Sequence, residues 1–203
     1  MMDFKMSATT ALIFSLLTIT FITTSAQKIK VVEGNLSILK GIKSYDIRFQ
    51  YDSIIIGTKT SEDDYLAKKK ADWNKREAGK GDQFVAMWYD DRKKRYEPEF
   101  IKNFEEIGEL KLGDKDSKYT ILMKSQSLEA GYDVFAWDSA PNINGELWIV
   151  ESANESKVIV KLSFDQMAGK YNSYYDFDIT RKIASAYTKA GKSLGFYVKR
   201  GTK

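Results

Sequence analysis

The closing stretch of the chain constrains the fold most, because its pattern predicts a long amphipathic helix. Its apolar residues recur at spacings of three and four: Ile179, Ile183, Tyr187, Ala190, Leu194 and Val198. A stripe of this kind must face a core. Lys199 and Arg200 stand at the carboxyl end, where the helix dipole favours cations. Gly191 and Gly195 each cost roughly 1 kcal/mol inside a helix, so we infer that they let it lie close to a sheet or a neighbouring element.

Five earlier segments have the apolar patterns of strands that such a helix could cover. They are residues 28–32, 45–51, 119–123, 147–150 and 158–164. Most of them alternate apolar and polar residues, which indicates half-buried strands, whereas the continuous apolar run at 147–150 indicates a strand covered on both faces. A polar loop at 152–156 joins the last two strands, so we expect those two to pair antiparallel.

A helical block separates the second of these strands from the third. Ser61 and Asp64 have the spacing of a capping box in front of a helix over 62–76. A second helix is predicted from Asp82, and Pro98 suits the first turn of a third. The third helix would turn inward Ile101, Phe104 and either Ile107 or Gly108. The order predicts an α+β domain, with an antiparallel sheet of about five strands, helices packed on one face and a long C-terminal helix.

Two missing residue types exclude several chemistries, because the chain contains no cysteine and no histidine. Disulfides, a lipid-modified cysteine, Ser-His-Asp triads and Cys-His pairs are excluded, and so are metal sites built on thiolates or imidazoles. The hydrophobic content of 43% is enough for a core without crosslinks. We therefore expect one domain over 27–203 that is held by packing, with no catalytic residue, metal or cofactor.

The first 26 residues have the layout of an export signal. Lys5 precedes an apolar run over 11–22, and Thr24, Ser25 and Ala26 supply the small residues of a cleavage site after Ala26. The run is shorter than the about 20 residues that a membrane-spanning helix needs. We expect a periplasmic or secreted protein without a stable membrane span after cleavage. The net charge of +4 is too small an excess to predict a nucleic-acid partner.

Several charged motifs have both a structural and a functional interpretation. The basic runs 68–70 and 92–95 have acidic neighbours, so we interpret them as solvated helix faces, with an anionic lipid or polysaccharide site as the alternative. Asp90 and Asp91 point about 100° apart on a helix and do not converge as an acid and a base. The segment 114–117 lacks the glycine and glutamate of a calcium loop and is interpreted as a polar turn.

Aromatic residues near loops are the best candidates for a ligand site. The candidate residues are Tyr132, Trp137, Asp138, Tyr171, Tyr174 and Tyr175. Aromatic rings in an exported protein can stack on sugars, with Asp138 bonding hydroxyls. They can also anchor a protein interface, in which Tyr and Trp are enriched. The remaining alternative is that 134–137 is another strand with packed side chains.

Three segments give the chain a resemblance to known proteins: the leader ending at residues 25–27, the helix SEDDYLAKKKADWNK and the closing ITRKIASAYTKAGKSLGFYVKR. The chain resembles uncharacterised exported proteins of Gram-negative envelopes. Its ending is similar to the terminal helix of small periplasmic domains related to the amino-terminal domain of TolB and to curli-secretion lipoproteins. The absence of cysteine departs from the lipoprotein members. The resemblance implies a periplasmic location and supplies no catalytic residues to carry over to this chain.

These observations lead to three functional hypotheses. The first is an exported, non-enzymatic domain that binds another envelope protein or a second copy of itself. The second is a glycan-binding module that uses the aromatic residues named above. The third is a carboxylate-dependent hydrolase, which would require acidic residues far apart in the sequence to converge.

Overall fold

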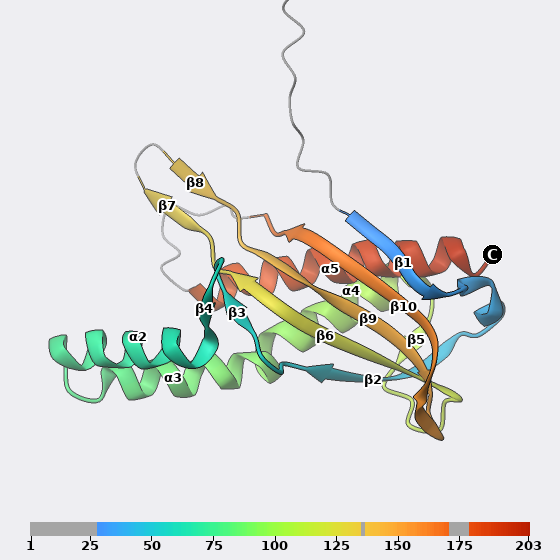
Figure 1. Cartoon of the computed structure of the whole chain (residues 1–203), viewed down its shortest axis with the longest axis horizontal. Helices are drawn as coiled ribbons and strands as arrows, with labels where there is room; N and C mark the ends of the chain where they lie inside the picture. The colour runs from blue at the N-terminus through green and yellow to red at the C-terminus, as the bar shows by residue number, and fades with distance from the viewer. Residues whose placement is uncertain (1–27, 135–136, 171–178) are drawn as a thin grey trace, which may run out of the picture.

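An eight-stranded sheet, two long helices behind it and a helical hairpin beyond its edge make up the protein (Figure 1). The computed structural model describes residues 28–134, 137–170 and 179–203, but not the side chains of 132–138. The leader at 1–26 therefore lies outside the described residues.

The elements follow the predicted alternation of strands and helices. The strands are β1 (Lys28–Gly34), β2 (Ser44–Gln50), β3 (Ile55–Ile56), β4 (Thr60–Ser61), β5 (Lys111–Leu112), β6 (Tyr119–Glu129), β7 (Tyr132–Val134), β8 (Trp137–Ser139), β9 (Asn142–Glu151) and β10 (Asn154–Ala168). The helices are α2 (Glu62–Arg76), α3 (Lys80–Asp91), α4 (Glu97–Gly108) and α5 (Ile179–Gly201), with a 3₁₀ turn η1 (Leu36–Leu39) and a π-helical segment η2 (Arg92–Tyr96). The α+β class and the long C-terminal helix are confirmed. Within the described ranges, every helix falls short of the length and apolar character that crossing a bilayer requires.

The sheet has more strands than expected and is mixed, whereas the sequence predicted an antiparallel one. Its order is β1-β10-β9-β6-β2-β5, with β3 beside the second half of β6 and β4 beside β3. The pairs β1–β10, β10–β9 and β9–β6 are antiparallel, as predicted for β9 and β10. The pairs β2–β6, β2–β5 and β3–β6 are parallel. Parallel pairing requires a long crossover, and the helical block between β2 and β6 is that crossover.

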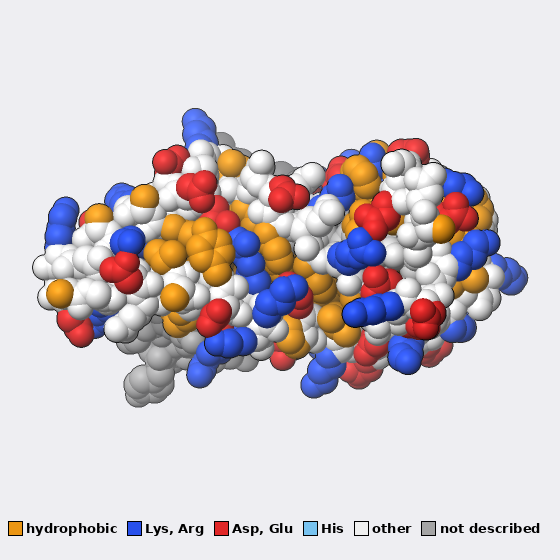
Figure 2. Space-filling model, turned by 90° about the horizontal axis from the view of Figure 1, so that it is seen from below, with side chains coloured by type: hydrophobic (Ala, Val, Ile, Leu, Met, Phe, Trp, Pro, Cys, Tyr) orange, Lys and Arg blue, Asp and Glu red, His pale blue; other side chains and the backbone are white. Residues whose placement is uncertain are grey.

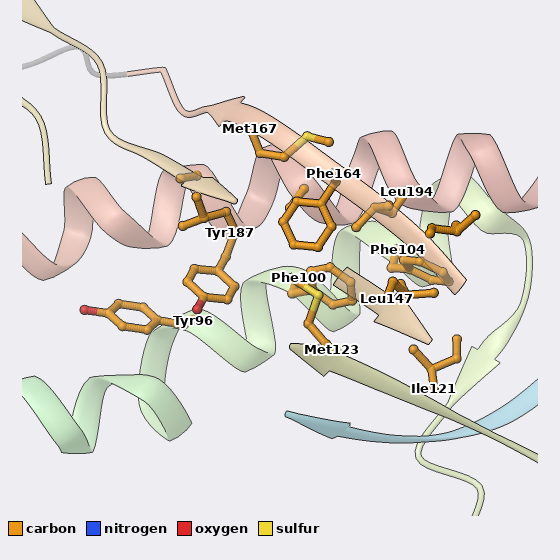
Figure 3. Packing of buried hydrophobic residues seen from close by; sticks show 14 of the residues in the cluster. Tyr96, Phe100, Phe104, Ile121, Met123, Leu147, Phe164, Met167, Tyr187 and Leu194 are labelled. Atoms are coloured by element: carbon orange, nitrogen blue, oxygen red, sulfur yellow. The ribbon is translucent and has the colours of Figure 1, made fainter. Parts of the chain in front are cut away.

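The core lies between the sheet and the pair α4–α5 (Figure 3). Phe100 and Phe104 of α4 are fully buried, as are Tyr187 and Leu194 of α5. Figure 3 shows them facing side chains from β6, β9 and β10, namely Ile121, Met123, Leu147, Phe164 and Met167. The apolar stripe predicted for the last helix is confirmed. On α4 the predicted Phe104 and Gly108 are buried, together with Phe100, which the prediction left out, whereas Ile101 and Ile107 are only partly buried.

The two helices cross closely because glycines lie at their contact. A Cβ atom at Gly191 would lie 2.5 Å from the backbone oxygen of Phe100, and one at Gly195 would lie 2.7 Å from that of Phe104. Neither distance leaves room for a methyl group. The glycines of α5 therefore permit a close approach, as the sequence predicted, and the neighbour is α4 rather than the sheet.

The helix boundaries largely follow the sequence signals. Helix α2 covers the predicted residues 62–76, and the Ser61 side chain accepts a hydrogen bond from the backbone N–H of Asp64 at 3.1 Å. Helix α3 begins two residues before the predicted Asp82. Pro98 lies in the first turn of α4, as predicted, but α4 continues η2 without a break, so the proline does not stand at a free helix start.

We predict that Gly191→Leu lowers the free energy of unfolding by about 2 kcal/mol, because the added side chain would force α4 and α5 apart. Leucine is favoured over glycine inside a helix by roughly 1 kcal/mol, and the predicted net loss already takes this gain into account. Urea denaturation measures the difference. The neighbouring exposed Lys192→Leu is the control, with a change expected within about 0.5 kcal/mol. Equal stabilities of the two variants would contradict the close crossing.

Candidate functional site

The basic run at 92–95 forms most of the π-helical segment η2, which joins α3 to α4 in one continuous helix. Each of its four cations contacts a carboxylate. The ion pairs are Arg92–Glu62, Lys93–Glu97, Lys94–Asp90 and Arg95–Asp91. The run is therefore neutralised within the protein, which leaves little attraction for an anionic ligand. It is not wholly solvated, however, because the Arg92 side chain is only 16% exposed.

Arg92 is held on all sides at the base of the helical hairpin. Its Nη2 donates to both oxygens of Glu62, at 2.6 and 2.5 Å. The indole N–H of Trp88 donates to the same carboxylate at 2.7 Å. The rings of Tyr51 and Tyr89 flank the guanidinium at 4.4 and 4.9 Å from their centroids. Because Glu62 begins α2 and Arg92 follows α3, this cluster closes the open end of the hairpin.

A chain of buried hydroxyls continues from Arg92 into the sheet. The Tyr51 hydroxyl donates to Glu97 Oε1 at 3.4 Å and interacts electrostatically with Tyr187 of α5, whose hydroxyl lies 2.7 Å from Ser125 Oγ of β6. Burial raises the pKa of Tyr51 and of Tyr187 well above the ordinary value for a tyrosine. Both hydroxyls therefore stay protonated and serve as structural hydrogen-bonding groups. This network attaches the base of the hairpin to the sheet.

Beyond this base, α2 and α3 form an apolar groove of about 450 Å³. Its lining comes from both helices and from the first residue of α5: Lys69, Trp73, Lys80, Gln83, Phe84, Met87 and Ile179. Leu66 is the only buried residue of α2, so most of this helix is not covered by the rest of the protein. Figure 2 shows hydrophobic side chains on the lobe where Figure 1 places the hairpin, with Lys and Arg beside them.

The described lining of the groove carries positive charge. Among the described residues that line it, two are lysines and none is acidic. Lys80 Nζ lies 5.3 Å from the centre of the Trp73 ring and pairs with Glu77 outside the groove. Lys69 Nζ lies 5.5 Å from the centre of the Tyr65 ring, whereas the neighbouring Lys70 pairs with Asp82. The groove thus combines an apolar floor with cationic edges.

The open face of the sheet is a weaker candidate, although Trp148 lies on it. Lys124 Nζ is 3.4 Å and Lys161 Nζ 4.1 Å from the centre of the Trp148 ring. Glu146 accepts the indole N–H at 2.8 Å. The two lysines lie against the Trp148 ring, and the indole N–H is already hydrogen-bonded to Glu146. A stacked sugar would need the same ring and the same N–H group.

The ligand residues predicted from the sequence are not described in enough detail to be assigned to a site. β7 pairs with β8 in a separate two-stranded sheet, but the side chains of Tyr132, Trp137 and Asp138 lie outside the description. Tyr171, Tyr174 and Tyr175 lie wholly outside the described residues. Their role in a ligand site stays a prediction.

The acidic motifs have structural roles where they are described. Asp114 accepts a hydrogen bond from the Ser44 hydroxyl at 2.6 Å, which lowers the pKa of the carboxyl group, and another from the backbone of Asp116. These contacts are those of a polar turn. In the described part of the chain, no three acidic side chains lie close enough together to hold a metal ion.

The groove was missed at the level of sequence because its residues resemble core positions. Trp73 follows Lys69 by four residues, and Met87 follows Phe84 by three, which is the spacing of a helix face that packs inward. The sequence signal that could have located the groove is the presence of Lys69 and Lys80 among these apolar residues. Lysines at such positions indicate a helix face that borders water rather than one inside the core.

No family model and no curated protein matches the chain. One solved structure, a PelC dodecamer from Paraburkholderia phytofirmans, is similar with a TM-score of 0.37 and 10% sequence identity, over 83% of this chain and 97% of that one. A likeness of this size is too slight to support a relationship.

We predict that Arg92→Ala destabilises the protein by about 3 kcal/mol, because it leaves the nearly buried Glu62 without its cation. Chemical denaturation measures the loss. Lys94→Ala removes an exposed ion pair of the same basic run and should leave the denaturation midpoint unchanged. If both variants behave alike, Arg92 does not have the anchoring role described above.

Proposed function

We propose that this protein is an exported, non-enzymatic binding domain whose α2–α3 groove holds an acidic amphipathic helix of an envelope protein. The single observation that carries the proposal is the groove itself. It places Trp73, Phe84 and Met87 at the surface of a hairpin that extends beyond the sheet (Figure 1). Apolar side chains gathered in an exposed groove are typical of protein interaction sites.

A helix suits the groove because two antiparallel helices already form its walls. Helices pack with their axes about 8–10 Å apart, by fitting the side chains of one between those of the others. A third helix laid along α2 and α3 would cover Trp73 and Met87, the latter 39% exposed at present. Recognition of an amphipathic helix in a groove is a recurrent mode of peptide binding.

An acidic partner suits the edges of the groove. Lys69 and Lys80 are the charged residues in the described lining of the groove, and the Arg76 guanidinium lies 5.5 Å from the centre of the Trp73 ring. Glutamates flanking an apolar stripe would meet these cations. Such charges mainly select the partner and speed its association, while the buried aromatic contact supplies most of the affinity.

Export supplies the compartment of the proposed partner. The leader pattern at 1–26 favours a periplasmic or secreted protein, so the partner would be an envelope component. A binding role also agrees with a sequence that lacks histidine and cysteine, the usual neutral-pH base and the strongest thiol nucleophile.

The prediction is tested with two synthetic helical peptides that share an apolar stripe and differ only in their flanking residues, Glu in one and Lys in the other. We expect the acidic peptide to bind about tenfold more tightly, with an affinity that falls as salt is added. Trp73→Ala should weaken binding by about 2 kcal/mol, because it removes the aromatic anchor. Fluorescence anisotropy of labelled peptides measures both effects.

The charge of the groove provides the control. The double variant Lys69→Glu/Lys80→Glu should reverse the preference and bind the basic peptide. The matched variant Lys189→Glu/Lys192→Glu changes the same charge on α5, away from the groove, and should keep the preference for the acidic peptide. Equal binding of both peptides, or a reversal in the α5 variant, would refute the proposal.

A further inference from the structure

A second surface lies at the edge of the sheet formed by β1. The two outermost strands of the main order differ in length, because β5 has two residues and β1 has seven. Among the described strands, β1 pairs with β10 alone, so the backbone groups of its outer side point away from the sheet. An open edge strand of this length is a template for pairing with another strand.

Apolar side chains gather along the same edge. Val31 is 43% and Val32 56% exposed, and Phe196 of α5 is 53% exposed. Val31 and Phe196 share the lining of a cavity of about 510 Å³ between β1 and α5. In the described residues, few large hydrophobic side chains are so exposed. Backbone and side chains of β1 therefore both favour covering by a partner.

The register of β1 on β10 contains an irregularity at Val32. Lys30 lies opposite Ser163, and Glu33 lies opposite Lys161, while Val32 is bulged. Since Ser163 and Lys161 are two residues apart on β10, they share a face of the sheet. In a regular strand, residues three apart lie on opposite faces. The bulge at Val32 adds one residue and so brings Lys30 and Glu33 to the same face.

We propose that β1 pairs antiparallel with β1 of a second copy of this chain about a two-fold axis. In the proposed register, Lys30 of each copy lies opposite Glu33 of the other, and the two Val31–Val32 pairs meet at the axis. Ile29 then lies opposite Gly34. The bulge makes this register consistent, because residues opposite each other on antiparallel strands must share a face.

Charge complementarity selects a second copy as the occupant. A two-fold axis presents the same surface from both sides, so the surface must complement itself. β1 meets this condition, because it carries Lys30 and Glu33 on one face at equal distances from the proposed axis. The Glu33 carboxylate is 58% exposed and lies 3.7 Å from Lys161 Nζ, so it has room for another cation.

The lysines of β1 also act against other pairings. A parallel, in-register pair would place Lys28 and Lys30 beside the same lysines of the second copy. An antiparallel register centred on Lys30 would place two Lys30 side chains opposite each other. Like charges directly opposite destabilise a strand pair. The pattern KIKVVEG therefore favours the register that pairs Lys30 with Glu33.

The test is a charge swap followed by sedimentation equilibrium of the purified protein over a concentration series. The unmodified protein should dimerise. Lys30→Glu and Glu33→Lys should each weaken the dimer by about tenfold, because each introduces two like-charge pairs across the axis. The double variant Lys30→Glu/Glu33→Lys should restore it, since opposite charges again face each other.

Two controls separate this proposal from the groove and from misfolding. Met87→Lys removes an exposed apolar side chain of the groove and should leave the dimer unchanged. Thermal unfolding of each variant establishes that it is folded. A chain that stays monomeric, single variants that dimerise like the parent, or a double variant that fails to restore the dimer would each overturn the proposal.

Hydrogen exchange on the unmodified protein gives a test that needs no variant. Amides of β1 that face outward should exchange more slowly as the protein concentration rises, whereas those of α2 should not change. Exchange of β1 that is independent of concentration would contradict the pairing.

Discussion

The partly buried ion pair between Arg92 and Glu62 is the contact on which the arrangement of the molecule depends. It joins the start of α2 to the end of α3, and the Tyr51 ring, directly after β2, packs against the Arg92 guanidinium and so connects the pair to the sheet. Beyond this base the hairpin is held to the rest of the protein by few buried side chains. The direction of the hairpin, and with it the position of the groove, is therefore set at one end.

A polar anchor at this place has a physical consequence that an apolar one would lack. Removing two charges from water costs several kcal/mol, so an ion pair of this kind adds little net stability. Its geometry is specific, however, because both oxygens of Glu62 and the Trp88 N–H must be satisfied together. We infer that the cluster fixes one orientation of the hairpin, whereas an apolar base would tolerate several.

The sequence predicted the elements more successfully than their arrangement. Local signals located α2, α5 and the β9–β10 hairpin, because caps, apolar periodicity and short loops act within a few residues. The parallel pairing of β2 with β6 could not be predicted in this way, since it depends on how the helical crossover returns to the sheet.

The π-helical segment could not be predicted from the sequence either, because residues 92–95 have the composition of an ordinary exposed helix. For the same reason, Arg92 was expected on a solvated face. The helical spacing of the groove residues Trp73 and Phe84 shows that a face is apolar, but not what covers it.

The two proposed interaction surfaces lie at opposite ends of the molecule, with the hairpin at one end and β1 at the other (Figure 1). Pairing at β1 would therefore leave both grooves of a dimer open, because neither α2 nor α3 contributes to that edge. Two grooves on one rigid sheet would bind a partner that displays two acidic helices more tightly than one groove could. The gain depends on the second helix being held near its groove, so it vanishes when the spacing of the partner's helices does not match. Each groove could then bind its helix weakly and the dimer would still hold the partner stably. Pairing at β1 achieves this by bringing a second groove into the assembly, without enlarging either one.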